Sequence, residues 1–156
     1  MNLVNRAATE ADALMLAQMN QRLIEDEHSR NPMTIDELHK RMTGWLKDEW
    51  GAQLFVESDT IIGYALYQLR QADYYPNRQM VYIRQFYIER DFRNRGLGSR
   101  AFKLLVENCF SADCAITIDV LASNPDGYRF WSRVGFHPYC TTMNLQRQEN
   151  RDAQTN

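Results

Sequence analysis

The sequence predicts one mixed α/β domain in which helices cover a mostly antiparallel sheet. Apolar residues alternate through residues 52–69 in a hairpin pattern, and other segments carry apolar residues at helical spacing. A helical segment also separates two β-rich runs, residues 81–88 and 115–121, and such a crossover joins parallel strands. With 156 residues, 44% of them hydrophobic, the chain can bury one core. We therefore expect a single domain over residues 1–147 and a polar C-terminal tail over residues 148–156.

The N-terminal part of the chain predicts one strand and two helices. Residues 3–4 begin the strand, and a capping pattern at residues 9–12 begins the first helix. The apolar side chains of this helix share one face: Leu16, Met19 and Leu23. The second helix starts at Thr34, which forms a capping box with Glu37. Its apolar face consists of Ile35, Leu38, Met42, Trp45 and Leu46.

The middle of the chain is β-rich. Residues 52–56 and 61–69 form the expected hairpin around a turn at residues 58–59. Residues 70–77 contain Tyr-Tyr-Pro-Asn and are expected to form a loop, after which residues 80–88 return as a strand. These segments form the antiparallel half of the predicted sheet.

The C-terminal half predicts a helix, a strand, a helix and a strand, in that order. One apolar face defines the first of these helices: Leu97, Ala101, Leu104, Leu105 and Cys109. Residues 115–121 form the strand that lies parallel to residues 81–88, and the next helix spans residues 125–134. We expect a last strand within residues 136–145.

Composition and charge exclude several classes of function. A net charge of −2 and a pI near 5.9 provide no basic field, so nucleic acid is not an expected partner. No run approaches the roughly twenty apolar residues of a membrane span and no leader pattern begins the chain, so we expect a cytoplasmic protein without a membrane partner. We expect no metal site, because metal-binding spacing is absent among the cysteines and histidines: Cys109, Cys114, Cys140, His28, His39 and His137.

A glycine-rich segment follows the strand at residues 81–88 and opens the next helix. Its sequence is Arg93-Asn94-Arg95-Gly96-Leu97-Gly98. Glycines let the backbone turn tightly and approach a ligand, while the unpaired amides and the dipole of the helix start favour an anion. Arg93 and Arg95 add positive charge, which suits a pyrophosphate. Glycine pairs also close ordinary turns, so this segment alone leaves both interpretations open.

A second motif runs from Asn124 to Phe136 and has clear helix boundaries. Asn124 is a good N-cap, and Pro125 stands where a helix tolerates proline. Asp126 favours the dipole of the first turn, and Gly135 stops the helix.

With these two motifs the sequence resembles the GCN5-related N-acetyltransferase (GNAT) superfamily. In that family an Arg/Gln-x-x-Gly-x-Gly/Ala loop holds the pyrophosphate of acetyl-CoA, and Asn-x-x-Ala/Gly-x-x-Phe/Leu-Tyr-x-x-x-Gly-Phe is a second signature. Both match here in order and spacing, and the resemblance covers residues 1–147. It implies a sheet splayed between its fourth and fifth strands and flanked by about four helices. It also implies direct transfer of an acetyl group to a primary amine of a small molecule or peptide.

The resemblance implies acetyl-CoA as the cofactor, lying in the V between residues 81–88 and 115–121. Strand backbone groups freed by the splay would bond to the pantetheine arm, and loop amides would bind the pyrophosphate. The positions implied to contact the cofactor are Phe86, Tyr87, Ile88, Arg93, Asn94, Arg95, Gly96, Leu97, Gly98, Ser99, Asn124 and Trp131. For Asn124, a capping role without cofactor contact is the alternative.

The catalytic residues are less defined by the motifs. Trp131 stands where many family members carry a tyrosine acid, and an indole N–H cannot supply a proton near neutral pH. Tyr82, Tyr128 and Glu25 are the candidates for acid or base, with Glu27 beside the last of them. Tyr128 shares a helix face with Trp131, although buried packing is the expected environment of that position. A solvated turn formed by the carboxylates of residues 25–27 is the alternative to a functional role for them. An ordered water that carries the proton away is the alternative to a side-chain base.

The acceptor and the assembly stay open at this level. Tyr74 and Tyr75 with the acidic residues 25–27 are candidates to frame a pocket for a cationic amine. A catalytically silent CoA-binding sensor or interaction module is the alternative that Trp131 favours, and another acyl-CoA, such as succinyl-CoA or propionyl-CoA, is an alternative donor. The resemblance leaves room for a homodimer, since family members often dimerise through their C-terminal half.

Overall fold

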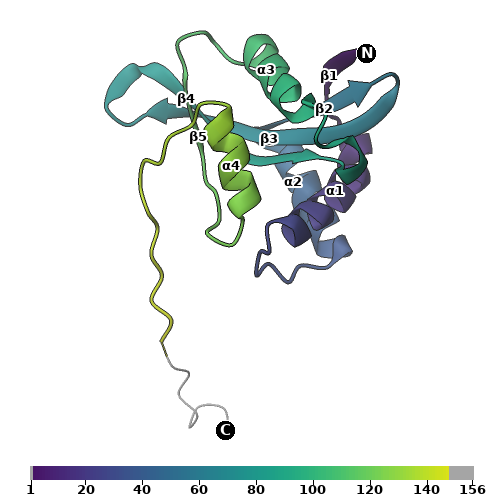
Figure 1. Cartoon of the computed structure of the whole chain (residues 1–156), viewed down its shortest axis with the longest axis horizontal. Helices are drawn as coiled ribbons and strands as arrows, with labels where there is room; N and C mark the ends of the chain where they lie inside the picture. Colours follow the sequence, from purple (N-terminus) through teal and green to yellow (C-terminus); the bar gives the residue numbers. More distant parts are fainter. Residues whose placement is uncertain (1, 148–156) are drawn as a thin grey trace, which may run out of the picture.

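The computed structural model describes residues 2–147 and contains a five-stranded sheet in the order β1-β2-β3-β4-β5 (Figure 1). The strands are β1 (Leu3–Ala7), β2 (Trp50–Glu57), β3 (Thr60–Ala72), β4 (Tyr75–Ile88) and β5 (Ala115–Ile118). The helices are α1 (Ala13–Asp26), α2 (Ile35–Lys47), α3 (Leu97–Cys109) and α4 (Pro125–Arg133). Two short helical turns, η1 (Glu10–Asp12) and η2 (Arg90–Phe92), precede α1 and α3. β4 and β5 are parallel and the other pairs are antiparallel, which confirms the predicted mixed α/β class.

Helices cover both faces of the sheet and produce two apolar cores. On one face, Met19 of α1 and Met42 of α2 share a buried cluster with Leu66 of β3. On the other face, Leu105 of α3 shares a cluster with Ala65 of β3. Neighbouring residues of a strand point to opposite faces, so Ala65 and Leu66 belong to different cores. The apolar helix faces predicted for α1, α2 and α3 are the faces that pack on the sheet.

Local signals in the sequence also hold. Thr34 accepts from the Glu37 backbone N–H and the Glu37 side chain accepts from the Thr34 N–H, so the predicted capping box starts α2. The β2–β3 hairpin turns at Ser58 and Asp59, whose φ angles are 48° and 68°. Such a pair suits the two-residue turn of a twisted hairpin.

The loop expected over residues 70–77 is wrong. β3 continues to Ala72 and β4 already starts at Tyr75, so only a short turn separates them. The ladder register shifts here, and residues 76–78 bulge out of the β4 backbone. The proline of this stretch therefore lies where no ladder hydrogen bond is required, which is how a loop-like sequence is accommodated within a strand.

β4 and β5 diverge after a short parallel ladder. Their last pair is Ile83 with Ile118, and β5 ends there, earlier than predicted, whereas β4 continues to Ile88. In the described part of the chain, residues 84–88 have no strand on the β5 side. Their backbone groups on that side need other hydrogen-bond partners. The splay predicted between the fourth and fifth strands is thus confirmed.

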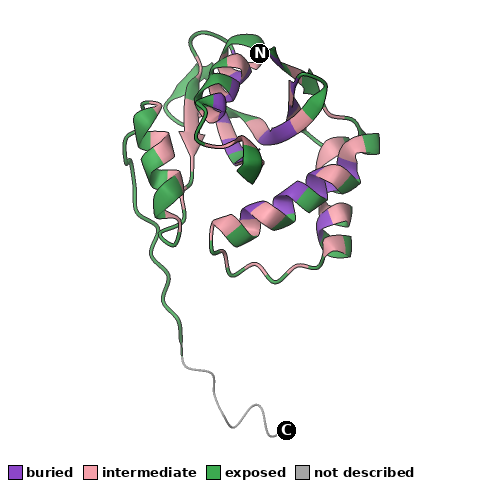
Figure 2. Ribbon diagram, turned by 45° about the vertical axis from the view of Figure 1, so that its right-hand side comes forward, coloured by how far each residue is buried: buried purple, intermediate pink, exposed green. Residues whose placement is uncertain are grey.

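The strand expected within residues 136–145 is wrong. From residue 136 to 147 the chain has no regular structure and runs away from the sheet (Figure 2). Its large apolar side chains are exposed: Tyr139 is 91%, Met143 87% and Leu145 88% accessible. Alternating residues make a strand only where the backbone finds a partner, and this segment has none in the described chain. The predicted tail, residues 148–156, lies outside the described residues.

Two further properties concern residues 2–147 as a whole. No helix in this range is both long enough and apolar enough to cross a membrane. The same residues contain no group of three or more His, Cys, Asp or Glu side chains placed to hold a metal ion.

The packing of α3 generates a stability prediction. Leu105→Ala removes a fully buried side chain between α3 and the sheet, so we expect a loss of about 3 kcal/mol in the free energy of unfolding, measured by urea denaturation. Leu69→Ala is the matched control, because Leu69 lies on β3 but is 50% exposed, and its expected change is within about 0.5 kcal/mol. Equal losses for both variants would contradict the described packing.

Candidate active site

The glycine loop turns between η2 and α3. Its backbone is left-handed at Asn94 (φ 62°) and at Gly96 (φ 73°), and Gly96 is the N-cap of α3. Glycine adopts this conformation without strain. The N–H of Arg100 bonds to the Gly96 carbonyl, and the preceding amides of α3 lie in the turn that has no intrahelical acceptor. The loop thus presents backbone amides and the positive end of a helix dipole, as an anion site requires.

The second glycine of the motif has a packing role. A Cβ at Gly98 would lie 3.2 Å from the Phe130 ring, whereas a Cβ at Gly96 would meet no heavy atom within 4 Å. Gly98 therefore allows α4 to lie close against the first turn of α3. The sequence pattern alone does not separate this role from contact with a ligand.

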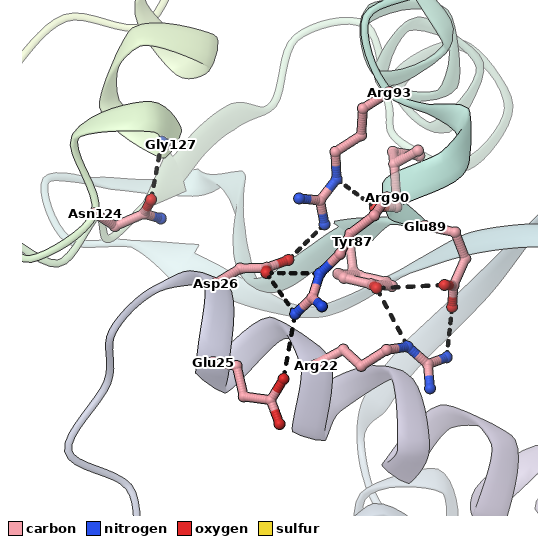
Figure 3. Close-up of polar contacts among 10 residues, drawn as sticks. Arg22, Glu25, Asp26, Tyr87, Glu89, Arg90, Arg93, Asn124 and Gly127 are labelled. Atoms are coloured by element: carbon pink, nitrogen blue, oxygen red, sulfur yellow. Dashed lines mark hydrogen bonds and ion pairs between the residues drawn. The ribbon is translucent and has the colours of Figure 1, made fainter.

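Asp26, the last residue of α1, binds two arginines next to the glycine loop (Figure 3). Its carboxylate lies 2.9 Å from Arg90 and 2.5 Å from Arg93. Arg90 also contacts Glu25 at 3.2 Å, and Arg93 Nε donates to the Ile88 carbonyl at 2.8 Å. The charge of Arg93, expected at the pyrophosphate, is therefore paired with α1.

A second ion pair joins α1 to the end of β4. Arg22 lies 2.5 Å from Glu89 and donates through Nε to the Tyr87 hydroxyl at 3.3 Å (Figure 3). Tyr87 is buried, so its side chain belongs to the core between α1 and the sheet. These contacts fix the end of α1 against the end of β4. Residues 84–88 of β4, which have no strand on the β5 side in the described part of the chain, form the open stretch of this strand.

A β-bulge marks the start of this open stretch. Leu66 pairs with Gln85 and Tyr67 pairs with Ile83, so Arg84 has no partner on β3. Bulges disrupt the ladder locally and change the direction of nearby side chains and amides. The bulge and the divergence of β5 therefore coincide, and β4 offers unpaired backbone groups from this point toward the glycine loop.

Glu27 is the one titratable group at this end of α1 with a strongly shifted acidity. Burial, and then the charge of Asp26, raise the pKa of its carboxyl to about 7. Ser123 donates to the Glu27 carbonyl at 2.8 Å, which ties this residue to the loop before α4. Burial, and then the Glu27 charge, raise the pKa of Tyr64, whose hydroxyl donates to Gln85 at 2.8 Å.

The predicted catalytic residues occupy separate places. Tyr82 donates to Asp119 at 2.7 Å, and burial together with this bond raises the pKa of its phenol to about 12. Tyr128 is 50% exposed on α4, so the burial expected for it is wrong. Glu25 pairs with Arg90 as described above. No hydrogen bond or ion pair joins these candidates to one another among residues 2–147.

The two cofactor positions expected on α4 have clear structural partners. Asn124 Oδ1 accepts from the Gly127 N–H at 3.0 Å, which confirms the N-cap, and a Cβ at Gly127 would lie 2.3 Å from the Asn124 amide nitrogen. Trp131 packs within an aromatic cluster, with ring centroids 4.9–5.5 Å from those of Phe86, Phe102, Phe130 and Phe136. This cluster fills the space between β4, α3 and α4.

The pocket expected between Tyr74, Tyr75 and residues 25–27 does not form. Tyr74 and Tyr75 lie at the exposed tip of the β3–β4 hairpin, where Arg78 stacks on the Tyr75 ring. Of the acidic residues, Glu25 and Asp26 contact Arg90, beyond the other end of β4. The β3 residues that pair with this span of β4 are Gly63 to Ala72, and a strand rises about 3.3 Å per residue, so roughly 30 Å separates the two groups.

A family model for the acetyltransferase (GNAT) family matches residues 16–136, so the chain belongs to this family. Its enzymes are acyltransferases, and acetyl-CoA is the cofactor. The paired motifs, the splayed sheet and the glycine loop on α3 are the features that the family assignment accounts for. A comparison with curated proteins finds no match.

Solved structures share the fold at low sequence identity. A possible acetyltransferase from Clostridium difficile 630 is 16% identical, with a TM-score of 0.77 over 96% of this chain and 100% of that one. A predicted acetyltransferase from Clostridium acetobutylicum, solved with acetyl-CoA, is 18% identical, with a TM-score of 0.70 over 93% and 96%. A ribosomal-protein-alanine N-acetyltransferase from Brucella melitensis biovar Abortus 2308 is 9% identical, with a TM-score of 0.67 over 94% and 100%.

The loop geometry generates a binding prediction. We expect Gly96→Asp to weaken acetyl-CoA binding at least about tenfold in calorimetry, because it places a negative charge at the amides that are expected to hold the pyrophosphate. Gly96→Asn is the matched control, since asparagine has the same shape, tolerates the left-handed φ and carries no charge. Equal affinity of the two variants would contradict an anion site at this loop.

Proposed function

We propose that the protein transfers an acetyl group from acetyl-CoA to a primary amine of a small molecule or peptide, with Glu27 as the general base. The observation that carries this proposal is the half-buried Glu27 at the end of α1, which the Ser123 hydrogen bond ties to the loop before α4. Burial, and then the charge of Asp26, raise the pKa of its carboxyl to about 7. No arginine or lysine of the described residues pairs with it, although Glu25 and Asp26 are both paired. A base is most efficient when its pKa lies near the operating pH.

The residues present fit the cofactor. The amides of Leu97, Gly98 and Ser99 would hold the pyrophosphate at the start of α3, and the exposed Arg95 would add charge there. Backbone groups of residues 86–88 on the open side of β4 would bond to the pantetheine arm. Bound acetyl-CoA supplies the activated acyl group as a thioester.

Proton movement in the reaction centres on Glu27. Its carboxylate takes a proton from the substrate ammonium, and the resulting neutral amine attacks the thioester carbonyl carbon. The C–N bond forms as the C–S bond breaks, and the departing thiolate takes up a proton from solvent. A backbone N–H of the bulged stretch would stabilise the negative charge on the carbonyl oxygen. In this scheme Glu27 takes the role for which Glu25, Tyr82 and Tyr128 were the candidates.

The tryptophan at position 131, in place of the usual tyrosine, is compatible with turnover of acetyl-CoA. A thiol has an ordinary pKa of about 8.5, so a thiolate leaves without full protonation near pH 8. Thiol release from acetyl-CoA, measured with a panel of amines and peptides, distinguishes the transferase from the catalytically silent CoA-binding sensor. Release that requires an acceptor supports the transferase, whereas CoA binding without release from any acceptor supports the sensor.

The raised pKa of Glu27 generates a pH prediction. A base must be unprotonated, so kcat/KM should be low below pH 6, rise through about pH 7 and then level off. We expect Glu27→Gln to lower kcat by about 10²-fold or more and to remove this step from the pH profile. Glu49→Gln, at an exposed carboxylate before β2, is the control. A Glu27→Gln profile that keeps the step would contradict the assignment.

The same shift predicts an effect on stability that needs no acceptor. The folded state keeps the Glu27 proton up to about pH 7, against an ordinary value of 4.5, so this group destabilises the fold as the pH rises between these values. Glu27→Gln should therefore be more stable than wild type at pH 8, on the order of 2 kcal/mol, and nearly equal at pH 4. Urea unfolding at both pH values measures the difference. A variant less stable than wild type at pH 8 would contradict the buried, unpaired carboxylate.

A further inference from the structure

Two arginines approach each other on the face of the sheet that α2 covers. Arg41 comes from α2 and Arg84 from the bulge of β4. Both guanidinium groups lie on the ring of Trp45, at 4.4 Å and 5.0 Å from its centroid. Arg84 also lies 5.9 Å from the centroid of Trp50. Both groups carry a positive charge, so a bound anion would offset the repulsion between them.

The chain itself supplies no such anion in its described part. Among residues 2–147, neither Arg41 nor Arg84 forms an ion pair, and the one hydrogen-bond partner of Arg41 is the neutral Asn20 amide oxygen, 3.1 Å from Nη2. The Nε of Arg41 is buried and has no hydrogen-bond partner at all. Burial, and then the charge of Arg84, lower the pKa of Arg41. A buried donor without an acceptor is costly and is rare in folded proteins.

The nearby carboxylate of Asp119 is engaged elsewhere, whereas that of Glu27 forms no ion pair within residues 2–147. Asp119 accepts from Tyr82, and Arg70 stacks on the ring of that tyrosine, with its Cζ 4.3 Å from the centroid. Burial raises the pKa of the Tyr64 hydroxyl most, the charge of Glu27 raises it further and the charge of Arg41 lowers it. An unpaired carboxylate and an unpaired guanidinium therefore both act on this hydroxyl. An acceptor that carries both an ammonium and a carboxylate would complement both groups.

We propose that Arg41 and Arg84 bind a carboxylate of the acceptor, so that the substrate is an amino acid or a related small amine that bears a carboxylate. This inference rests on the proposed function, because Glu27 would take the proton from the ammonium of the same molecule. Guanidinium groups bind carboxylates through paired N–H donors, and the site offers two such groups. Trp45 and Trp50 would form an apolar wall beside the bound molecule.

The test compares each amino acid with its own carboxamide in the thiol-release assay. Wild type should show a KM at least tenfold lower for the carboxylate form. In Arg84→Gln the ratio of the two KM values should fall toward one, because one of the two charges that bind the carboxylate is gone. Arg78→Gln is the matched control, since Arg78 lies on the same strand at the far hairpin tip and stacks on Tyr75. It should keep the wild-type ratio.

Three results would overturn the inference. The first is equal use of both forms by wild type, and the second is an unchanged ratio in Arg84→Gln. The third is a loss of acetyl-CoA affinity in Arg84→Gln with no effect on carboxylate preference, which would assign the arginines to a cofactor phosphate instead.

A calorimetric measurement separates this inference from the proposed function. Amino acids and their carboxamides are titrated into the CoA-saturated protein, with and without Arg84→Gln. If no acceptor is turned over but the carboxylate form binds wild type and not the variant, the proposed function fails and the carboxylate site stands. If amines are turned over while neither form is distinguished, the transferase stands and the carboxylate site is wrong. Thermal melting of each variant confirms that it is folded.

Discussion

The ion pairs of Asp26 with Arg90 and Arg93 are the contact on which the site depends. They hold the end of α1 against the end of β4 and the start of the glycine loop, three segments that are remote in sequence. They also decide the chemistry of the neighbouring carboxylates. Glu25 and Asp26 form ion pairs with these arginines, whereas Glu27 pairs with no arginine or lysine of the described residues. Burial, and then the charge of Asp26, raise the pKa of the Glu27 carboxyl. One cluster therefore positions the glycine loop and leaves unpaired the carboxylate that we propose as the base.

Two irregularities of the backbone, the bulge in β4 and the early end of β5, leave backbone hydrogen-bonding groups free for a ligand. A regular β4 would bond to β5 along its length and leave no polar backbone groups for a ligand. The bulge at Arg84 and the early end of β5 interrupt the ladder at one level of the sheet, where Gln85 and Tyr64 also meet. Aromatic rings around Trp131 fill the neighbouring space between helices and strand. The opening is thus bounded by apolar packing on one side and by polar groups on the other, which suits an amide-rich ligand.

Features that depend on neighbours in sequence were predictable, and features that depend on distant partners were not. The Thr34 cap, the hairpin turn and the Asn124 cap follow from residues a few positions apart, and the paired motifs identified the fold and the cofactor. Residues 25–27 are similar carboxylates in a row, and burial together with the remote Arg90 and Arg93 distinguishes Glu27. The exposure of Tyr128 depends on how α4 rests on Phe86 through Phe130. The prediction of a strand within residues 136–145 was wrong because the alternating pattern is present but no strand of the described chain pairs with it.

The outer edge of β5 has a consequence for handling the molecule. Its residues, Ala115-Ile116-Thr117-Ile118, include no charge and no proline, the devices by which sheet edges usually avoid pairing with other chains. The exposed segment that contains Tyr139 and Leu145 has the alternation that such an edge accepts. We therefore expect self-association through the edge of β5 to increase with protein concentration. A charged substitution on β5 should make the protein more soluble without changing the glycine loop.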